Sequence, residues 1–172
     1  ATHIGGGYVL TAGHCFWAGD NLSKDLPCAD TTVEWGVREG TSPYLKSTCQ
    51  KILFAQWNKK SDFAILRVFP VPDEFVDLEL AYRPEANDII TIFSHPNGLP
   101  LRWSKTCIVE SVLDPQLPPD VLQHKCDTNP VSSGATIIDT ATNRVVGIHN
   151  GGFLYGPTTG MNYGTYLTNT EV

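Results

Sequence analysis

The chain has 172 residues, a formal net charge of −6 and 41% hydrophobic residues, enough for one or two small domains with a substantial core. No segment approaches the ~18 consecutive apolar residues of a membrane span, and no cluster of lysines and arginines stands out. The composition therefore predicts a soluble, turn-rich globular protein and argues against nucleic acid or an anionic membrane as its partner.

Short segments rich in β-branched and aromatic residues follow one another along the chain, with turn residues between them. In chain order, we expect strands within residues 8–12, 31–37, 51–57, 63–69, 89–95, 101–113, 134–150 and 161–168. The segment 135–149 is expected to form a hairpin around a polar "DTATN" turn. Residues 69–88 interrupt the pattern with prolines and acids, which suits a connection between two β units. This succession of strands predicts an all-β barrel or sandwich.

The five cysteines are spaced singly along the chain, and none forms a CxxC pair. Such spacing is typical of disulfides in an exported protein, so we expect a secreted or periplasmic location. The chain opens at "ATHIGGG" without a methionine, which we interpret as a trimmed segment of such a protein. The histidines show neither HxH nor HxxxH spacing, so we expect no metal site, and we expect no cofactor.

Three short motifs place a histidine, an aspartate and a serine on loops that flank strands. "YVLTAGHC" carries His14, "SDFAILRV" carries Asp62 and "NPVSSGA" carries Ser133. A serine hydroxyl needs a base within hydrogen-bond reach before it becomes a useful nucleophile. Histidine can take and return that proton near neutral pH, and a buried carboxylate fixes its tautomer. The three together predict nucleophilic catalysis by Ser133.

The segments "GYVLTAGHC", "DFAILRV" and "CDTNPVSSGATII…VVGIHNGG" resemble the signature regions of chymotrypsin-fold serine endopeptidases, most closely the bacterial glutamyl-endopeptidase-like branch. The resemblance implies an all-β fold of two packed six-stranded antiparallel β-barrels. Residues 1–80 would form the first barrel, which would lack its N-terminal strand or strands, and residues 81–172 the second. The triad would lie in the cleft between them, and peptides or proteins would be the substrates.

The resemblance also implies the pairing of the cysteines. Cys28 would pair with Cys49 in the first barrel, and Cys107 with Cys126 in the second. Cys15 would lose a partner located upstream of Ala1. The sequence alone leaves other pairings open.

In the branch that the chain resembles, a threonine ahead of the nucleophile and a histidine after it bind an acidic P1 side chain. Thr128 and His149 match these positions, and a hydroxyl together with an imidazolium would favour a buried carboxylate. Asp127 offers a rival, because trypsin-type enzymes carry an aspartate six residues before the nucleophile and bind Lys or Arg. His149 could also be a core histidine. Substrate backbone would pair with the strand edge that contains Asn150, Gly151 and Gly152.

The nucleophile loop departs from the branch at Val131, where glycine is usual. The N–H groups of Val131 and Ser133 would form the oxyanion hole, and a β-branched residue adopts the required backbone conformation at a cost. Ser132 replaces the aspartate of digestive enzymes, so a trypsinogen-type activation switch should be absent. Two alternatives to an active endopeptidase therefore stay open: a pseudoprotease or binding module impaired at Val131, and an esterase, which the lack of GxSxG disfavours.

Overall fold

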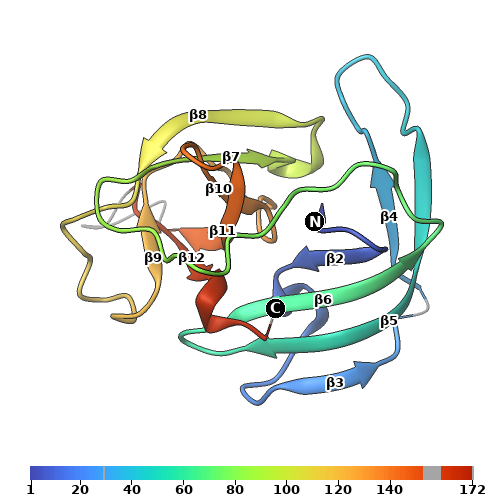
Figure 1. The fold of residues 1–172 in the computed structure, drawn as a ribbon, viewed down its shortest axis with the longest axis horizontal. Coiled ribbons are helices and arrows are strands. Elements are labelled where there is room, and N and C mark those ends of the chain that lie inside the picture. Colours follow the sequence, from blue (N-terminus) through green and yellow to red (C-terminus); the bar gives the residue numbers. More distant parts are fainter. Residues whose placement is uncertain (29, 153–159, 172) are drawn as a thin grey trace.

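The computed structural model describes residues 1–28, 30–152 and 160–171. In this part of the chain the extended segments form two sheets, each with six strands (Figure 1). The strands of the first sheet are β1 (Thr2–His3), β2 (Tyr8–Thr11), β3 (Ser23–Leu26), β4 (Thr32–Trp35), β5 (Leu45–Trp57) and β6 (Asp62–Phe69). Those of the second are β7 (Ile89–Ser94), β8 (Arg102–Ile108), β9 (Leu122–His124), β10 (Thr136–Asp139), β11 (Arg144–Gly152) and β12 (Asn162–Tyr166). Three 3₁₀ turns complete the structure: η1 (Gly13–Phe16), η2 (Pro96–Gly98) and η3 (Leu167–Asn169).

The first sheet has the strand order β1-β2-β6-β5-β3, with β4 also paired to β5, and every pairing is antiparallel. The long strand β5 bends at two register shifts, after Cys49 and after Ile52, and can therefore serve three neighbours. Buried residues of β5 and β6, among them Ile52 and Leu66, form a core with Val9 of β2. The Cys28–Cys49 disulfide lies in this core.

The second sheet has the order β8-β7-β10-β11-β12-β9, again fully antiparallel. Strands β10 and β11 form the hairpin that the sequence predicted, and Ile90, Ile137 and Val146 fill the core. The Cys107–Cys126 disulfide joins β8 to the segment after β9. Both cysteine pairs are those that the resemblance implied, and Cys15 is unpaired and exposed.

The two sheets lie side by side and share a third apolar cluster. Leu10, Phe63 and Ile65 of the first sheet pack there against Val145 and Ile148 of the second. The connection 69–88 runs between the sheets, and the Glu79 N–H donates to the Val145 carbonyl. The expected all-β architecture, with six antiparallel strands in each of two packed units, is thus confirmed.

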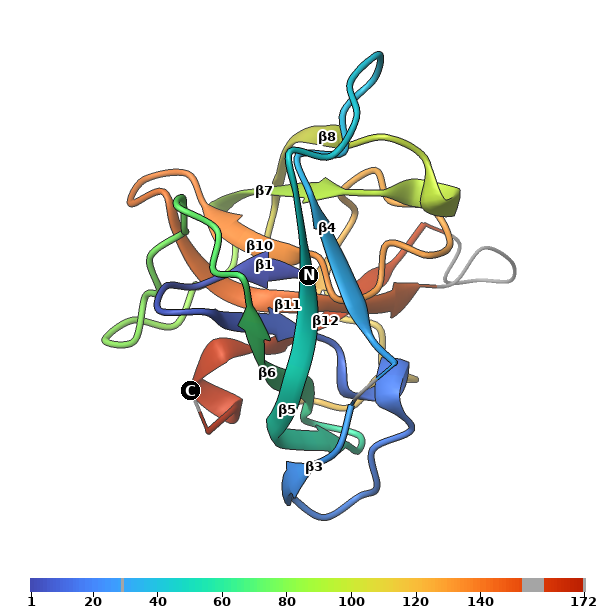
Figure 2. The same cartoon turned by 90° about the vertical axis from the view of Figure 1, so that its right-hand side faces the viewer.

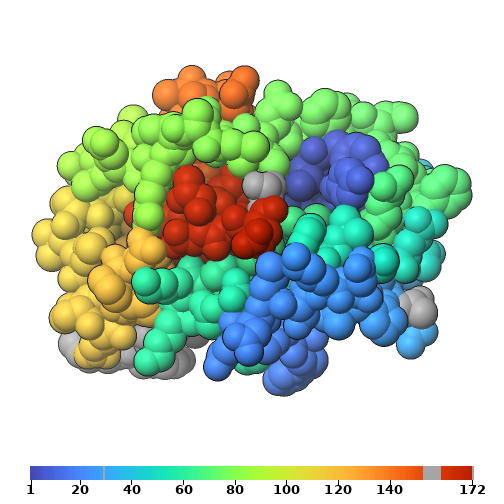
Figure 3. Space-filling view, turned by 60° about the horizontal axis from the view of Figure 1, so that its bottom comes forward, coloured from blue at the N-terminus to red at the C-terminus, as the bar shows by residue number. Residues whose placement is uncertain are grey.

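Two further contacts tie the halves together. The 36–44 connection projects from the body of the molecule (Figure 2). Near its start the Leu101 N–H donates to the Val37 carbonyl. The C-terminal segment returns to the first half (Figure 3). There the Ser61 hydroxyl donates to the Asn169 carbonyl. Among the described residues no helix is long and apolar enough to span a bilayer.

Candidate active site

His14 and Asp62 meet at the end of the first sheet. His14 lies in η1, directly after β2, and Asp62 is the first residue of β6. One carboxylate oxygen of Asp62 accepts from the His14 backbone N–H at 2.9 Å, and the other lies 2.7 Å from the ring atom Nδ1. Gly13 permits this turn, because a Cβ atom there would lie only 2.1 Å from the Gln56 carbonyl oxygen. The double contact fixes both the backbone and the ring of His14.

The environment of His14 suits a general base. The hydrogen bond to Asp62 raises the pKa of His14, an effect that partial burial opposes and that the Asp62 charge reinforces. Asp62 itself is buried, whereas His14 is partly accessible. With Nδ1–H donating to Asp62, Nε2 is the ring atom left to accept a proton.

Ser133 lies in the loop between β9 and β10, and this loop packs against the strand that leads to His14. A Cβ atom on Gly134 would lie 2.2 Å from Thr11 Oγ1 and 3.0 Å from the Ala12 nitrogen, so only glycine fits this close approach. The Ser133 hydroxyl donates to the Asn150 carbonyl at 2.9 Å. Among the described residues no hydrogen bond joins Ser133 to His14, so a transfer of the Ser133 proton to His14 would require the hydroxyl to rotate.

Asn150 connects the serine to the aspartate. It occupies a β-bulge, since His149 pairs with Gly164 and Gly151 with Tyr163. The bulge redirects the Asn150 side chain, whose Nδ2 donates to the Asp62 carbonyl at 2.9 Å while its Oδ1 accepts from Thr165. Asn150 thus bonds through its carbonyl to Ser133 and through its amide to Asp62. The sequence pointed only to the strand edge here, not to this bridge.

The backbone at Val131 adopts the conformation that would usually call for glycine. Its φ is 72°, and its side chain is exposed. The Pro130 carbonyl accepts from the Asn97 N–H of η2 at 2.8 Å. Because the C=O and N–H of a trans peptide point in opposite directions, this bond turns the Val131 N–H away from η2. In the described part of the chain, no backbone acceptor is bonded to the N–H of Val131 or of Ser133.

A pocket of about 310 Å³ lies beside the serine. Its walls include Thr128, His149 and Asn162, and the two oxyanion candidates line it as well. Gly151 and Gly152 form the strand edge along it. Asp127, the alternative residue for binding a basic P1 side chain, is exposed and is not among the described residues that line this pocket.

His149 does not carry the positive charge that the sequence suggested. Burial, reinforced by the charge of His14, lowers the pKa of His149 to about 4, so the ring is neutral near pH 7. Its Nδ1 lies 3.2 Å from Nε2 of His124, a fully buried residue of β9. His124 matched no sequence motif, because its contact with His149 arises only when β9 and β11 flank β12.

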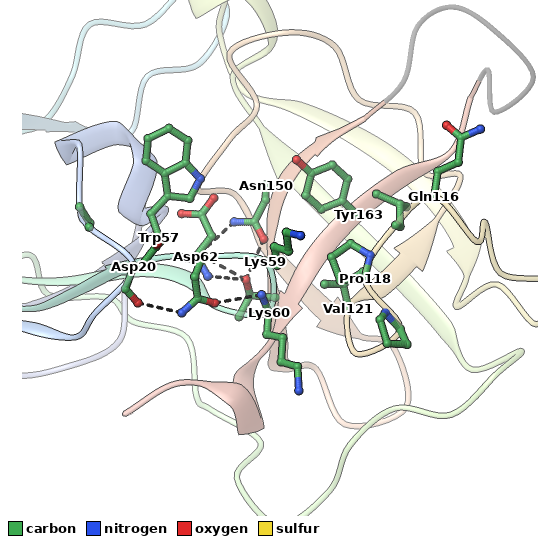
Figure 4. A pocket seen from close by; sticks show the side chains of 16 residues that line it. Asp20, Trp57, Lys59, Lys60, Asp62, Gln116, Pro118, Val121, Asn150 and Tyr163 are labelled. Atoms are coloured by element: carbon green, nitrogen blue, oxygen red, sulfur yellow. Dashed lines mark hydrogen bonds between the residues drawn. The ribbon is translucent and has the colours of Figure 1, made fainter.

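A larger cleft of about 990 Å³ has Asp62 and Asn150 among its lining residues (Figure 4). Trp57, Lys59 and Lys60 border it from the first half of the chain, and Val121 and Tyr163 from the second. Their side chains surround an open space next to Asp62 (Figure 4). Within the described residues, no group of three His, Cys, Asp or Glu side chains could hold a metal ion.

A family model for the trypsin-like peptidase domain matches residues 2–148. The chain belongs to this family. As a trypsin-like peptidase domain it is a serine endopeptidase, which agrees with the geometry of His14, Asp62 and Ser133 described above. No protein with a curated description matches the chain.

The trypsin-like peptidase domain also has relatives among solved structures. The protease Anisep from Arthrobacter nicotinovorans superposes with a TM-score of 0.71 at 18% identity, covering 96% of this chain and 80% of that protein. The thermostable serine protease AL20 from an extremophilic microorganism gives 0.69 at 13% identity, with 96% and 82% covered. The inactive form of the Rv3671c protease gives 0.61 at 17% identity, with 96% and 76% covered. At these identities the likeness concerns the fold alone.

Proposed function

We propose that His14, Asp62 and Ser133 form the catalytic triad of this peptidase. His14 takes the Ser133 proton on Nε2 as Oγ attacks the scissile carbonyl, and it then returns the proton to the leaving amine. Asp62 holds Nδ1–H and stabilises the imidazolium that forms. A water molecule then attacks the acyl-enzyme, with His14 again taking the proton and returning it to Ser133 Oγ. The observation that carries this proposal is the link from Ser133 through Asn150 to the His14–Asp62 pair.

The N–H groups of Val131 and Ser133 are proposed to form the oxyanion hole. Both residues line the small pocket, and no backbone acceptor in the described part of the chain is bonded to either N–H. Stabilising charge in the transition state requires donors that are already oriented, and the bond from Asn97 to Pro130 orients one of them. These contacts support an active enzyme over a pseudoprotease impaired at Val131.

For the P1 side chain we propose an acidic residue. Thr128 and His149 offer a hydroxyl and a ring N–H to the small pocket, and no carboxylate lies among its described lining residues. The larger cleft is proposed to take further residues of the substrate, with Lys59 and Lys60 at its border.

The location of the protein is proposed to be outside the cytoplasm. Two disulfides support such an oxidising location.

A fluorophosphonate probe and a P1-diverse peptide library test the proposal. We expect the probe to label Ser133 and the library to be cut after Glu or Asp. Ser133→Ala and His14→Ala should abolish both labelling and cleavage, whereas Ser111→Ala, at an exposed serine, should change neither. An oxidised, folded protein that is neither labelled nor active would refute the triad, and cleavage after Lys or Arg would refute the acidic pocket.

A further inference from the structure

The two buried histidines of the second sheet form a directed chain of hydrogen bonds. The chain begins at the backbone N–H of Cys126, which donates to His124 Nδ1 at 3.2 Å. A ring nitrogen that accepts a hydrogen bond carries no proton, so neutral His124 must be protonated on Nε2. Nε2 of His124 lies 3.2 Å from Nδ1 of His149 and therefore donates to it.

The same reasoning determines the state of His149. Because its Nδ1 accepts, the proton of the neutral ring must be on Nε2. Among the described residues, Nε2 of His149 has no hydrogen-bond partner, and His149 is one of the residues that line the small pocket. The proton on Nε2 is therefore available to a group inside that pocket.

The alternative protonation states conflict with this frame. A His149 cation would need a proton on Nδ1, which would meet the Nε2–H of His124. Moving that proton to His124 Nδ1 would place it against the Cys126 N–H. Burial also lowers the pKa of both rings, in agreement with a neutral pair. The backbone amide of Cys126 thus selects one tautomer in each ring.

The frame that holds His124 is rigid. Cys126 is buried and disulfide-bonded to Cys107, and its carbonyl accepts from Asn162 Nδ2 at 2.9 Å. His124 itself is fully buried at the end of β9, where it pairs with Asn162 of β12. The donor that starts the chain is therefore held in place by a covalent bond and by strand pairing.

We infer that His124 is a positioning residue for substrate specificity: it holds His149 in the Nε2–H tautomer, so that the pocket offers a neutral donor to an acidic P1 side chain. This inference rests on the proposed function, because it concerns the same pocket. Recognition by hydrogen bonding, with Thr128 as a second donor, thus replaces the charge pair that the sequence suggested. Without His124, the His149 ring could take the other tautomer and present a lone pair that repels a carboxylate.

Two variants of His124 separate orientation from packing. His124→Phe keeps a ring of similar shape but removes the donor to His149. His124→Gln restores an N–H near the position of Nε2. Both variants remove the acceptor that His124 Nδ1 offers to Cys126. A difference between the two variants therefore reports the hydrogen bond to His149.

The first measurement is the kcat/KM ratio for matched peptides with Glu or Gln at P1. We expect His124→Phe to lower the Glu:Gln ratio about tenfold or more, since a hydrogen bond to a charged group contributes more free energy than one between neutral groups. The rate on the Gln peptide should change little, and His124→Gln should keep the ratio within about threefold of the wild type. An unchanged ratio in His124→Phe would overturn the inference.

The second measurement does not depend on activity. Nitrogen-15 spectra of histidine-labelled protein, with His149 assigned through a His149→Gln variant, report its tautomer directly. We expect the Nε2–H form in the wild type and in His124→Gln, and its loss in His124→Phe. A wild-type His149 protonated on Nδ1 refutes the inference even if the enzyme prefers Glu. An enzyme without a preference for Glu refutes the acidic pocket, while the spectra still decide the role of His124.

Discussion

At the scale of single residues, Val131 is the main departure from the family pattern, and its backbone already adopts the left-handed conformation with φ of 72°. Because glycine would adopt the same conformation, Val131→Gly should change kcat by no more than about threefold relative to the wild type. The gain or loss of an oxyanion donor would instead change kcat by ~10²–10³. The variant should also be more stable by up to about 1 kcal/mol, since a β-branched residue is strained at positive φ. Steady-state kinetics and denaturant unfolding measure the two effects. A rise of 10²-fold or more in kcat would instead support the impaired-enzyme alternative.

The protonation of His14 predicts the acidic limb of the pH–rate profile. The base must be neutral, and Asp62 raises its pKa above the ordinary value of 6.5. kcat/KM should therefore increase with pH through a midpoint above 6.5, measured on a peptide with an uncharged P1 residue. His149→Gln should leave this midpoint in place, because the pKa of His149 is about 4. A wild-type midpoint at or below 6.5 would contradict the role given to the His14–Asp62 pair.

At the scale of elements, the two disulfides close loops of similar length, with sequence separations of 21 for Cys28–Cys49 and 19 for Cys107–Cys126. Replacing either pair with serines should lower the free energy of unfolding by about 3 kcal/mol, or the melting temperature by ~8 °C. The second pair is connected to the wall of the small pocket, because the Cys126 carbonyl accepts from Nδ2 of the lining residue Asn162. Its loss should therefore also lower kcat/KM, whereas loss of Cys28–Cys49 should leave kcat/KM unchanged. Calorimetry and kinetics on both double variants make the comparison, and equal kinetic effects would contradict it.

How far the sequence predicted these elements depended on whether the information was local. The strand that ends at His14, the strand that begins at Asp62 and the β10–β11 hairpin follow from short apolar patterns and turn residues. The orientation of Val131 does not, because it depends on a hydrogen bond from Asn97, a distant residue in another loop. His124 was missed and His149 was assigned the wrong charge for the same reason. Their states follow from burial and from strand pairing across β12, which no local pattern contains.

At the scale of the whole molecule, the site depends on how the two sheets are joined. His14 and Asp62 come from the first sheet, and Ser133 and Asn150 from the second half of the chain. The apolar cluster of Phe63 and Ile148 holds the halves together beneath them. Asn150 and Thr165 then bond to the backbone of Asp62 across the junction, so that these contacts between the two halves form only when both halves are folded.

The buried histidine pair also makes the stability of the whole fold sensitive to acid. His149 has a pKa of about 4 in the folded chain and close to 6.5 when unfolded, so below pH 6.5 the unfolded chain binds more protons. The free energy of unfolding should therefore fall as the pH is lowered from 6.5 towards 4, by about 3 kcal/mol from His149 alone.

The experiment compares the wild type with a variant that lacks the histidine pair. His14, whose pKa is raised, acts with the opposite sign but is present in both proteins. Urea unfolding of the wild type and of a His124→Gln/His149→Gln double variant, at pH 7 and at pH 4.5, isolates the pair. The wild type should lose more stability than the variant, because only the wild type must keep both rings uncharged to remain folded; equal losses would mean that the pair is already protonated in the folded state.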